Sequence, residues 1–323
     1  MTTSGHLTST ELPGPVVALA GGVGGSKLAD GLQAHLGRQL TVIVNTADDT
    51  ERHGLLVSPD HDTVMYTLAG LADDEQGWGL RGETFAGAEM LARLGEETWF
   101  RLGDRDLAVH IARSRRLREG QRPTVVALHL QASLGVAATI LPMTDQPVRT
   151  LVLTDAGWLD FQEYFVHRHQ EPTVLGLRLQ GIDAAAPSPE VLAALEAASL
   201  IVIGPSNPLV SIGPILAVPG MREAIAAARA RGVTVAAVSG IIGGRAVRGP
   251  ADRMLASLGH EVSALGVARL YAGVADVFLL DDIDASLAGG VAALDLRPVV
   301  LPLLMADSAG RRRLAGDLLA AVR

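Results

Sequence analysis

The sequence contains no cysteine among its 323 residues, and only 3% of its residues are aromatic. The absence of cysteine excludes disulfides, thiolate metal sites and a cysteine nucleophile, and it agrees with a cytoplasmic protein. Hydrophobic residues nevertheless make up 48% of the chain. Because so few of them are aromatic, the core is predicted to be large and aliphatic.

Two further absences concern partners. Lysine and arginine form no dense basic face and the net charge is −8, so we expect no nucleic acid partner, because phosphate backbones require such a face. No apolar run approaches the roughly 18 residues of a membrane span, and the polar start of the chain lacks the pattern of a signal peptide. We therefore expect no membrane association, and a disordered tail over residues 1–15.

The most informative stretch is VVALAGGVGGSKLADGL, which starts at Val16. An apolar run, a glycine-rich turn and an apolar-periodic segment predict a strand, a tight turn and a helix. Such a turn lets a phosphate approach the backbone at a helix N-terminus. The stretch fits neither well-known phosphate motif, since Ser26 separates Gly25 from Lys27 and the third glycine of the dinucleotide fingerprint is missing. Taken alone, the stretch is compatible with a phosphate-binding loop or with a tight turn that binds no ligand. In either case the turn is formed by Gly21, Gly22, Gly24 and Gly25.

A second strand is predicted over Leu40–Asn45, followed by a cluster of acidic residues. The carboxyl ends of parallel strands meet at one sheet edge, so this cluster should lie beside the glycine turn. Carboxylates beside a phosphate suit Mg²⁺ or a general base, although turns and helix caps also use aspartate. Asp62 or Thr63 is the predicted N-cap of the following helix. Four carboxylates within fifteen residues favour the metal or base, and they are Asp48, Asp49, Asp60 and Asp62.

Two later segments supply further candidates. A helical stretch carries Trp78, either a ring-stacking wall or simple packing, and Arg105, either an anion clamp or a surface residue; the neighbouring Asp104 is the predicted helix cap. Farther on, the loop GPSNPLVS follows a predicted strand, and its hydroxyl and amide groups suit a phosphate or a guanine edge. The candidates in this loop are Ser206, Asn207 and Ser211.

Strands and helices alternate along the chain, with predicted strands that include Thr150–Thr154 and Val174–Leu179. This alternation predicts an α/β, Rossmann-like, doubly wound and mostly parallel sheet with a helical insertion. We expect residues 16–323 to form a single domain, with the insertion at about residues 64–135.

Several of these segments together resemble a known family, the 2-phospho-L-lactate transferases of coenzyme F-420 biosynthesis, including its phosphoenolpyruvyl branch. The matching segments are AGGVGGSKLADGL, VNTADDTERHGLLVSPDHDTVMYTLAG, LGDRDLAVHIARS, LPMTDQPVRT, FQEYFV, IGPSNPLVSIGPILAVPG and SGIIGGRAVRGPA. The resemblance implies a dimeric, Mg²⁺-dependent enzyme that moves a phospho-acyl unit from a GMP-linked donor to a hydroxyl of the deazaflavin Fo, releasing GMP. One departure is Ala47, where some relatives have glycine.

Under this resemblance the glycine turn and the Ser206-Asn207 loop would hold the donor, with Lys27 on a phosphate. Asp48 or Asp49 would bind Mg²⁺, and Asp62 would be a further ligand or the base that accepts the hydroxyl proton. The catalytic candidates are Asp62 and Asp49. Fo would lie against Asp60 to Tyr66 and Trp78. The remaining candidate substrate-binding residues are Asn45, Thr63, Arg105 and Ser211.

Two other classes of function stay open at this point. An NAD(P)-dependent oxidoreductase is disfavoured because the second strand ends in Asn45 rather than in an acidic residue and because the glycine pattern differs. A non-catalytic nucleotide-binding regulator is disfavoured by the carboxylate cluster. Whether the donor carries lactate, enolpyruvate or glycerate is not readable from these residues.

Overall fold

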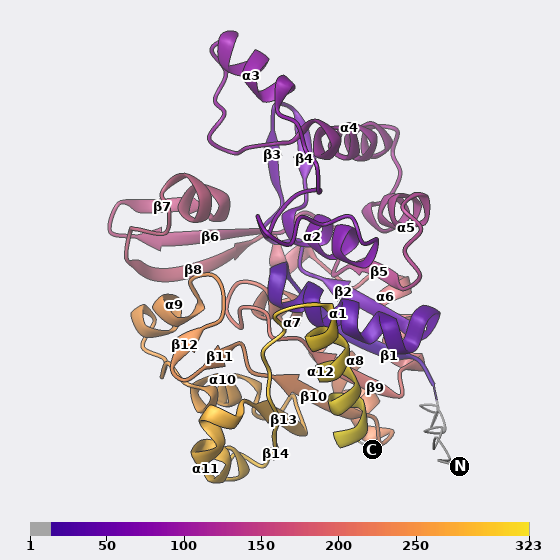
Figure 1. Cartoon of the computed structure of the whole chain (residues 1–323), viewed down its shortest axis with the longest axis vertical. Coiled ribbons are helices and arrows are strands. Elements are labelled where there is room, and N and C mark those ends of the chain that lie inside the picture. The colour runs from indigo at the N-terminus through magenta and orange to yellow at the C-terminus, as the bar shows by residue number, and fades with distance from the viewer. Residues whose placement is uncertain (1–13, 323) are drawn as a thin grey trace, which may run out of the picture.

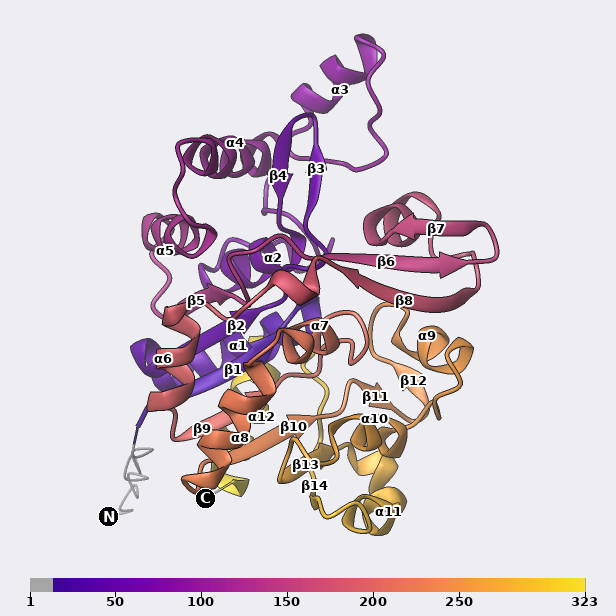
Figure 2. The same ribbon diagram turned by 180° about the vertical axis from the view of Figure 1, so that it is seen from behind.

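The computed structural model describes residues 14–322 and is built on a seven-stranded, fully parallel sheet (Figures 1 and 2). The predicted tail, residues 1–15, therefore lies almost wholly outside the described residues. The strand order is β5-β2-β1-β9-β10-β13-β14, which confirms the predicted doubly wound class. The strands are β1 Val16–Ala20, β2 Leu40–Val44, β5 Thr139–Pro142, β9 Leu200–Ile203, β10 Thr234–Val238, β13 Val277–Leu280 and β14 Arg297–Val300.

Helices cover both faces of this sheet, and each face has its own core. Alternate residues of one strand point to opposite sides: Val17 and Leu19 of β1 pack with α6, α7, α8 and α10, whereas Val16 and Ala18 pack with α1, α2, α5 and α12. These helices are α1 Gly22–Leu36, α2 Pro59–Leu68, α5 Pro123–Ser133, α6 Pro189–Ala197, α7 Ile212–Ala217, α8 Met221–Ala230, α10 Ala264–Tyr271 and α12 Ser308–Ala321. None of the helices described is long and apolar enough to cross a membrane.

The strand order reverses between β1 and β9, which lie side by side although about 180 residues separate them. In open α/β sheets, ligands bind at such a switch point, beyond the carboxyl ends of the strands. The loops that leave these two strands are the glycine turn and the Ser206-Asn207 loop. Both predicted phosphate-binding loops therefore start at one place.

Three segments extend away from the central sheet, as Figure 1 shows. The first is the hairpin β3 Thr50–Arg52 and β4 Leu55–Val57, and the second holds α3 Ala86–Arg93 and α4 Asp104–Arg118. The third is an antiparallel sheet of β6 Arg149–Thr154, β7 Gly157–Asp160 and β8 Val174–Gln180. The strands predicted near Thr150 and Val174 exist, but they belong to this separate sheet, because β6 pairs with β8 and β7 rather than with the central strands.

The remaining elements are short. They are the hairpin β11 Ile241–Ile242 and β12 Arg245–Ala246, the helices α9 Ala251–Ser257 and α11 Ala288–Ala292, and the helical turns η1 Gly37–Gln39, η2 Glu163–His167, η3 Ile182–Ala184 and η4 Asp282–Leu287.

Two predicted helix caps were wrong. Helix α2 starts at Pro59, so Asp62 lies in its first turn and is not the N-cap; proline suits that first position because it needs no N–H donor there. Asp104 does not cap its own helix, whose N-cap is Gly103. Its carboxylate instead accepts hydrogen bonds from the backbone N–H groups of Ala86 and Gly87 at 3.1 and 2.9 Å, at the start of α3.

Candidate active site

A cavity of about 740 Å³ opens at the switch point of the sheet. The glycine turn, the first turn of α2 and the loop after β9 all contribute to its wall. It is large enough for a drug-sized ligand with a second small molecule. Of the residues predicted from the sequence, it is lined by Gly21, Gly22, Gly24, Lys27, Asp48, Asp60, Asp62, Thr63, Trp78, Ser206, Asn207 and Ser211.

The glycine turn is locked to the loop after β9. The Ser206 hydroxyl accepts a hydrogen bond from the Gly21 N–H at 3.0 Å and donates one to the Gly21 carbonyl at 2.7 Å. A Cβ on Gly24 would lie 2.5 Å from the Pro205 carbonyl oxygen, and one on Gly21 would lie 2.5 Å from Asp60 Oδ2. The glycines therefore let the turn, the first turn of α2 and the loop after β9 pack closely together. The sequence analysis had explained these glycines only by the approach of a ligand.

Two carboxylates meet beside this turn, from the loop after β2 and from α2. The Asn45 side-chain amide donates to Asp60 Oδ2 at 2.9 Å. Burial raises the pKa of Asp60 to about 6. Burial also raises the pKa of Asp48, and the charge of Asp60 raises it further. Asp48 Oδ1 is buried and has no hydrogen-bond partner among the described residues.

Asp62 lies in a different, densely connected network. Its carboxylate forms a two-pronged, buried ion pair with the Arg113 guanidinium, with one N–O distance of 2.9 Å. Burial works to raise the pKa of Asp62, but the positive charge of Arg113 outweighs it and holds that pKa below its usual range. Asp62 is thus an ionised hydrogen-bond acceptor at the cavity wall.

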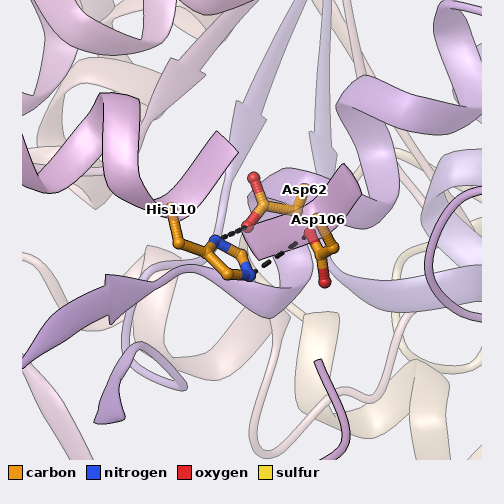
Figure 3. A group of neighbouring side chains, drawn as sticks. All are labelled: Asp62, Asp106 and His110. Atoms are coloured by element: carbon orange, nitrogen blue, oxygen red, sulfur yellow. Dashed lines mark ion pairs between the residues drawn. The ribbon is translucent and has the colours of Figure 1, made fainter. Parts of the chain in front are cut away.

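His110 connects this pair to a second carboxylate, as Figure 3 shows. Its Nδ1 lies 3.1 Å from Arg113 Nη1, and its Nε2 lies 3.2 Å from Asp106 Oδ1. The Tyr66 hydroxyl donates to the same Asp106 oxygen at 2.5 Å. Helix α4 supplies Asp106, His110 and Arg113 from one face, at spacings of three and four residues. The sequence analysis missed all three, although that spacing is visible in DRDLAVHIAR.

The side chains of Asp62, Asp106 and His110 offer three ligand atoms within 4.8 Å of one another, enough to hold a metal ion. Two of them already contact the Arg113 guanidinium, which would repel a cation. Asp48 and Asp60 fit Mg²⁺ better, because they present hard oxygen ligands whose mutual repulsion a divalent cation would relieve. Asp48 Oδ1, which has no hydrogen-bond partner among the described residues, also favours Mg²⁺ binding by Asp48 and Asp60.

Four predicted site residues lie outside the cavity lining. Asn45 and Gly25 are buried behind it, Gly25 against Ser206 and Asn45 against Asp60. Arg105 is exposed and donates to the Arg81 carbonyl at 3.0 Å. Asp49 faces a second cavity of about 200 Å³ on the other side of α2, so its metal-binding role stays a prediction.

An aromatic wall that sequence reasoning did not assemble lines the other side of the large cavity. Trp78 is joined there by aromatic side chains from the loop before α4 and from the segment around η2. Phe161 and Phe165 stack with ring centroids 5.4 Å apart. Tyr66 of α2 lines the cavity as well. In a chain so poor in aromatic residues, the gathering of six at one cavity, five of them in this wall, favours a flat, ring-containing ligand. The five are Trp78, Trp99, Phe100, Phe161 and Phe165.

Comparison with known proteins places this site in context. Residues 16–295 match the family model described as 2-phospho-L-lactate transferase CofD. A phosphoenolpyruvate transferase of Streptomyces griseus is 45% identical over 299 residues, covering 90% of this chain and 93% of the relative. A 2-phospho-L-lactate transferase of Methanosarcina mazei is 43% identical over 270 residues, covering 83% and 88%.

A solved structure, of a UPF0052-family protein from Bacillus halodurans, aligns with a TM-score of 0.61 over 96% of this chain and 100% of that one. At 16% identity, that likeness shows the fold alone.

Proposed function

The chain belongs to the 2-phospho-L-lactate transferase CofD family and is a transferase, and we propose that it acts in coenzyme F-420 biosynthesis. It transfers a 2-phospholactyl or phosphoenolpyruvyl group from a GMP-linked donor to the ribityl hydroxyl of Fo, releasing GMP. One observation carries this proposal: a single cavity joins a glycine turn, a group of carboxylates and an aromatic wall. A purely regulatory nucleotide site would need no second, aromatic compartment.

The donor diphosphate lies at the N-terminus of α1, where the backbone N–H groups of the glycine turn favour an anion. Asp48 and Asp60 would hold Mg²⁺, which would neutralise the negative charge of the diphosphate oxygens. Fo stacks on the aromatic wall, with its ribityl chain directed toward α2. This arrangement brings the acceptor hydroxyl and the distal phosphorus together, which is the main contribution that phosphoryl transfer requires of a protein.

In the transfer step the Fo hydroxyl oxygen bonds to the distal phosphorus, and the bond from that phosphorus to the bridging oxygen breaks. The electron pair stays on GMP, and the hydroxyl proton passes to a carboxylate. Asp62 accepts and orients that hydroxyl, because Arg113 keeps it ionised. A loose transition state needs orientation more than a strong base.

The binding test is a titration of Fo fluorescence with and without GDP and Mg²⁺. We expect saturable binding that tightens when GDP and Mg²⁺ are present. Trp99→Leu, which shortens the aromatic wall, should weaken Fo binding about tenfold, whereas Trp158→Leu, on exposed β7 outside the cavity, should not. Fo that never binds would overturn the proposal. If Fo binds but the phospho-acyl group is not transferred from the donor, the alternative of a non-catalytic nucleotide-binding regulator would be favoured.

The metal assignment has its own test, which does not depend on turnover. Asp48→Asn should abolish the extra thermal stability that Mg²⁺ gives to the GDP complex, because a neutral amide is a poor Mg²⁺ ligand. Asp145→Asn is the control, since Asp145 instead binds Arg122 and Thr124. An unchanged Mg²⁺ effect in Asp48→Asn would place the ion elsewhere, at the Asp62, Asp106 and His110 group.

We also propose that the protein is a homodimer in the cytoplasm. Helix α3 has no buried residue; Met90 within it is 53% exposed, and Leu94, directly after its last residue, is 72% exposed. Sedimentation equilibrium at several concentrations checks the dimer, and a purely monomeric species would refute it.

A further inference from the structure

Of the three cationic side chains that line the cavity, Lys27, Arg101 and Arg248, none has a carboxylate partner among the described residues, and Lys27 and Arg248 lie together. Lys27 projects from α1, and Arg248 comes from the loop after β12; both line the cavity. Among residues 14–322, neither forms an ion pair within 4.0 Å. The sequence has 27 lysine and arginine residues together, and Lys27 is its sole lysine. Lysine is therefore not a general surface residue in this chain.

Nearby acidic groups are already engaged. Asp74 pairs with the Arg311 guanidinium. Asp73 accepts hydrogen bonds from the backbone N–H groups of Glu75 and Gln76 at 3.1 and 2.9 Å. Neither carboxylate forms an ion pair with Arg248 within 4.0 Å.

The cations also repel one another. Burial lowers the pKa of Lys27, and the positive charges of Arg311 and Arg248 lower it further, against a smaller opposing effect of Asp74. Among the described residues, the only hydrogen bond of the ammonium group is the one that it donates to the Met305 carbonyl at 3.4 Å. Bringing like charges together in this way is unfavourable unless an anion joins them.

Lys27 and Arg248 also share a recess of about 20 Å³ between α1 and the loop around Trp78. That volume admits a group of a few atoms and excludes a purine or deazaflavin ring. Gly77, with a φ of +79°, forms part of its wall, and a Cβ there would collide with the Arg248 guanidinium. The other polar side chains of the recess are the hydroxyls of Ser26, Thr63 and Thr67, the Trp78 indole and the two carboxylates described above, Asp73 and Asp74.

We propose that Arg248 and Lys27 bind the carboxylate of the acyl group carried by the donor. The proposal rests on the proposed function, which supplies that carboxylate one carbon away from the phosphate ester oxygen. A planar carboxylate fits the fork of a guanidinium, and the ammonium adds a point charge. The recess adjoins the glycine turn, so a diphosphate at that turn places its acyl end within reach. Recognition of the acyl carboxylate distinguishes the donor from GDP.

The test compares two guanosine diphosphate esters by calorimetry: the 2-lactyl ester, which is one of the two proposed donors, and the ethyl ester, which differs only in lacking the carboxylate. The parent protein should bind the lactyl ester about tenfold more tightly. In Arg248→Gln that preference should disappear, while the ethyl ester keeps its affinity within about twofold. Lys27→Gln should reduce the preference in the same way.

Arg245→Gln is the matched control, since Arg245 is exposed on β12 of the same hairpin and does not line the cavity. Retained binding of the ethyl ester shows that each variant is folded. If Arg248→Gln weakens both esters equally, Arg248 contacts the diphosphate and the inference is wrong; it is also wrong if neither ester is affected. If the parent protein binds neither ester, the proposed function itself fails.

Discussion

Asp62 illustrates how one side chain can be read differently from sequence and from structure. Its position in an acidic cluster predicts a metal ligand or a base. In the structure its two oxygens face Arg113, so its charge is already balanced. The lowered pKa that results leaves it a permanent acceptor, whereas Asp48 and Asp60, with raised pKa values, are the residues that gain from a cation.

Removing one partner of the Asp62–Arg113 pair should be costly. Asp62→Asn leaves a buried guanidinium without its carboxylate, which should lower the free energy of unfolding by about 3–5 kcal/mol. The double variant with Arg113→Gln should lose much less than the sum of the two single changes. Urea unfolding measures both. The exposed pair Arg313–Asp317 is the control, worth at most about 0.5 kcal/mol. Additive losses at Asp62 and Arg113 would contradict the coupling.

Asp49 should make stability depend on pH. Burial raises its pKa from 3.8 to about 7, so the folded state holds a proton that the unfolded state has released. The contribution of protonated Asp49 to the free energy of unfolding is fully present below about pH 4 and is lost as the pH rises through 7. Asp49→Asn keeps the shape without the charge, so relative to the parent it should gain at least about 1 kcal/mol between pH 5 and pH 8. Equal differences between the two proteins at both pH values would rule this out.

At the scale of elements, the glycine turn matters mainly as a packing surface. Helix α1 can begin directly after β1 because Gly21, Gly24 and Gly25 leave room for Asp60, Pro205 and Ser206. The proposed donor site therefore depends on the close packing of the glycine turn, α2 and the loop after β9.

Adding one methyl group to this turn should separate those elements. Gly24→Ala places a Cβ 2.5 Å from the Pro205 carbonyl oxygen, so we expect a loss of about 1–3 kcal/mol of stability and weaker GDP binding. Gly289→Ala is the control, because no atom lies within 4 Å of its added methyl and helix propensity favours alanine by up to about 1 kcal/mol. Thermal unfolding and GDP titration give both quantities, and a Gly24→Ala protein as stable as the parent would exclude tight packing here.

At the scale of the whole molecule, local patterns predicted the sheet but not what surrounds the cavity. The strand predicted over Leu40–Asn45 is present as β2, Leu40–Val44, because an apolar run buried on both faces leaves a strong signal. The sheet of β6, β7 and β8 was not separated from the central one, since strand partners are not encoded locally. The aromatic wall and the Arg113 network join residues from elements far apart in sequence, and only the fold brings them together.

Every central strand except β14 contributes residues to both cores, so the molecule should unfold as one unit. Near- and far-ultraviolet circular dichroism should give coincident thermal transitions. Ligand at a hundredfold excess over its Kd should add about 2.7 kcal/mol to the stability reported by both signals. Two separated transitions, of which GDP moved only one, would show that the cavity belongs to part of the molecule.

The solitary lysine has a consequence for chemical labelling. Lys27 carries the only ε-amino group of the sequence, it lines the cavity, and its lowered pKa increases the fraction present as a nucleophilic free amine. An amine-directed acylating reagent would therefore modify one side chain, in the cavity itself. The rate of that modification, followed by the mass of the peptide that contains Lys27, would report directly whether the cavity is occupied, without a reporter group or a turnover assay.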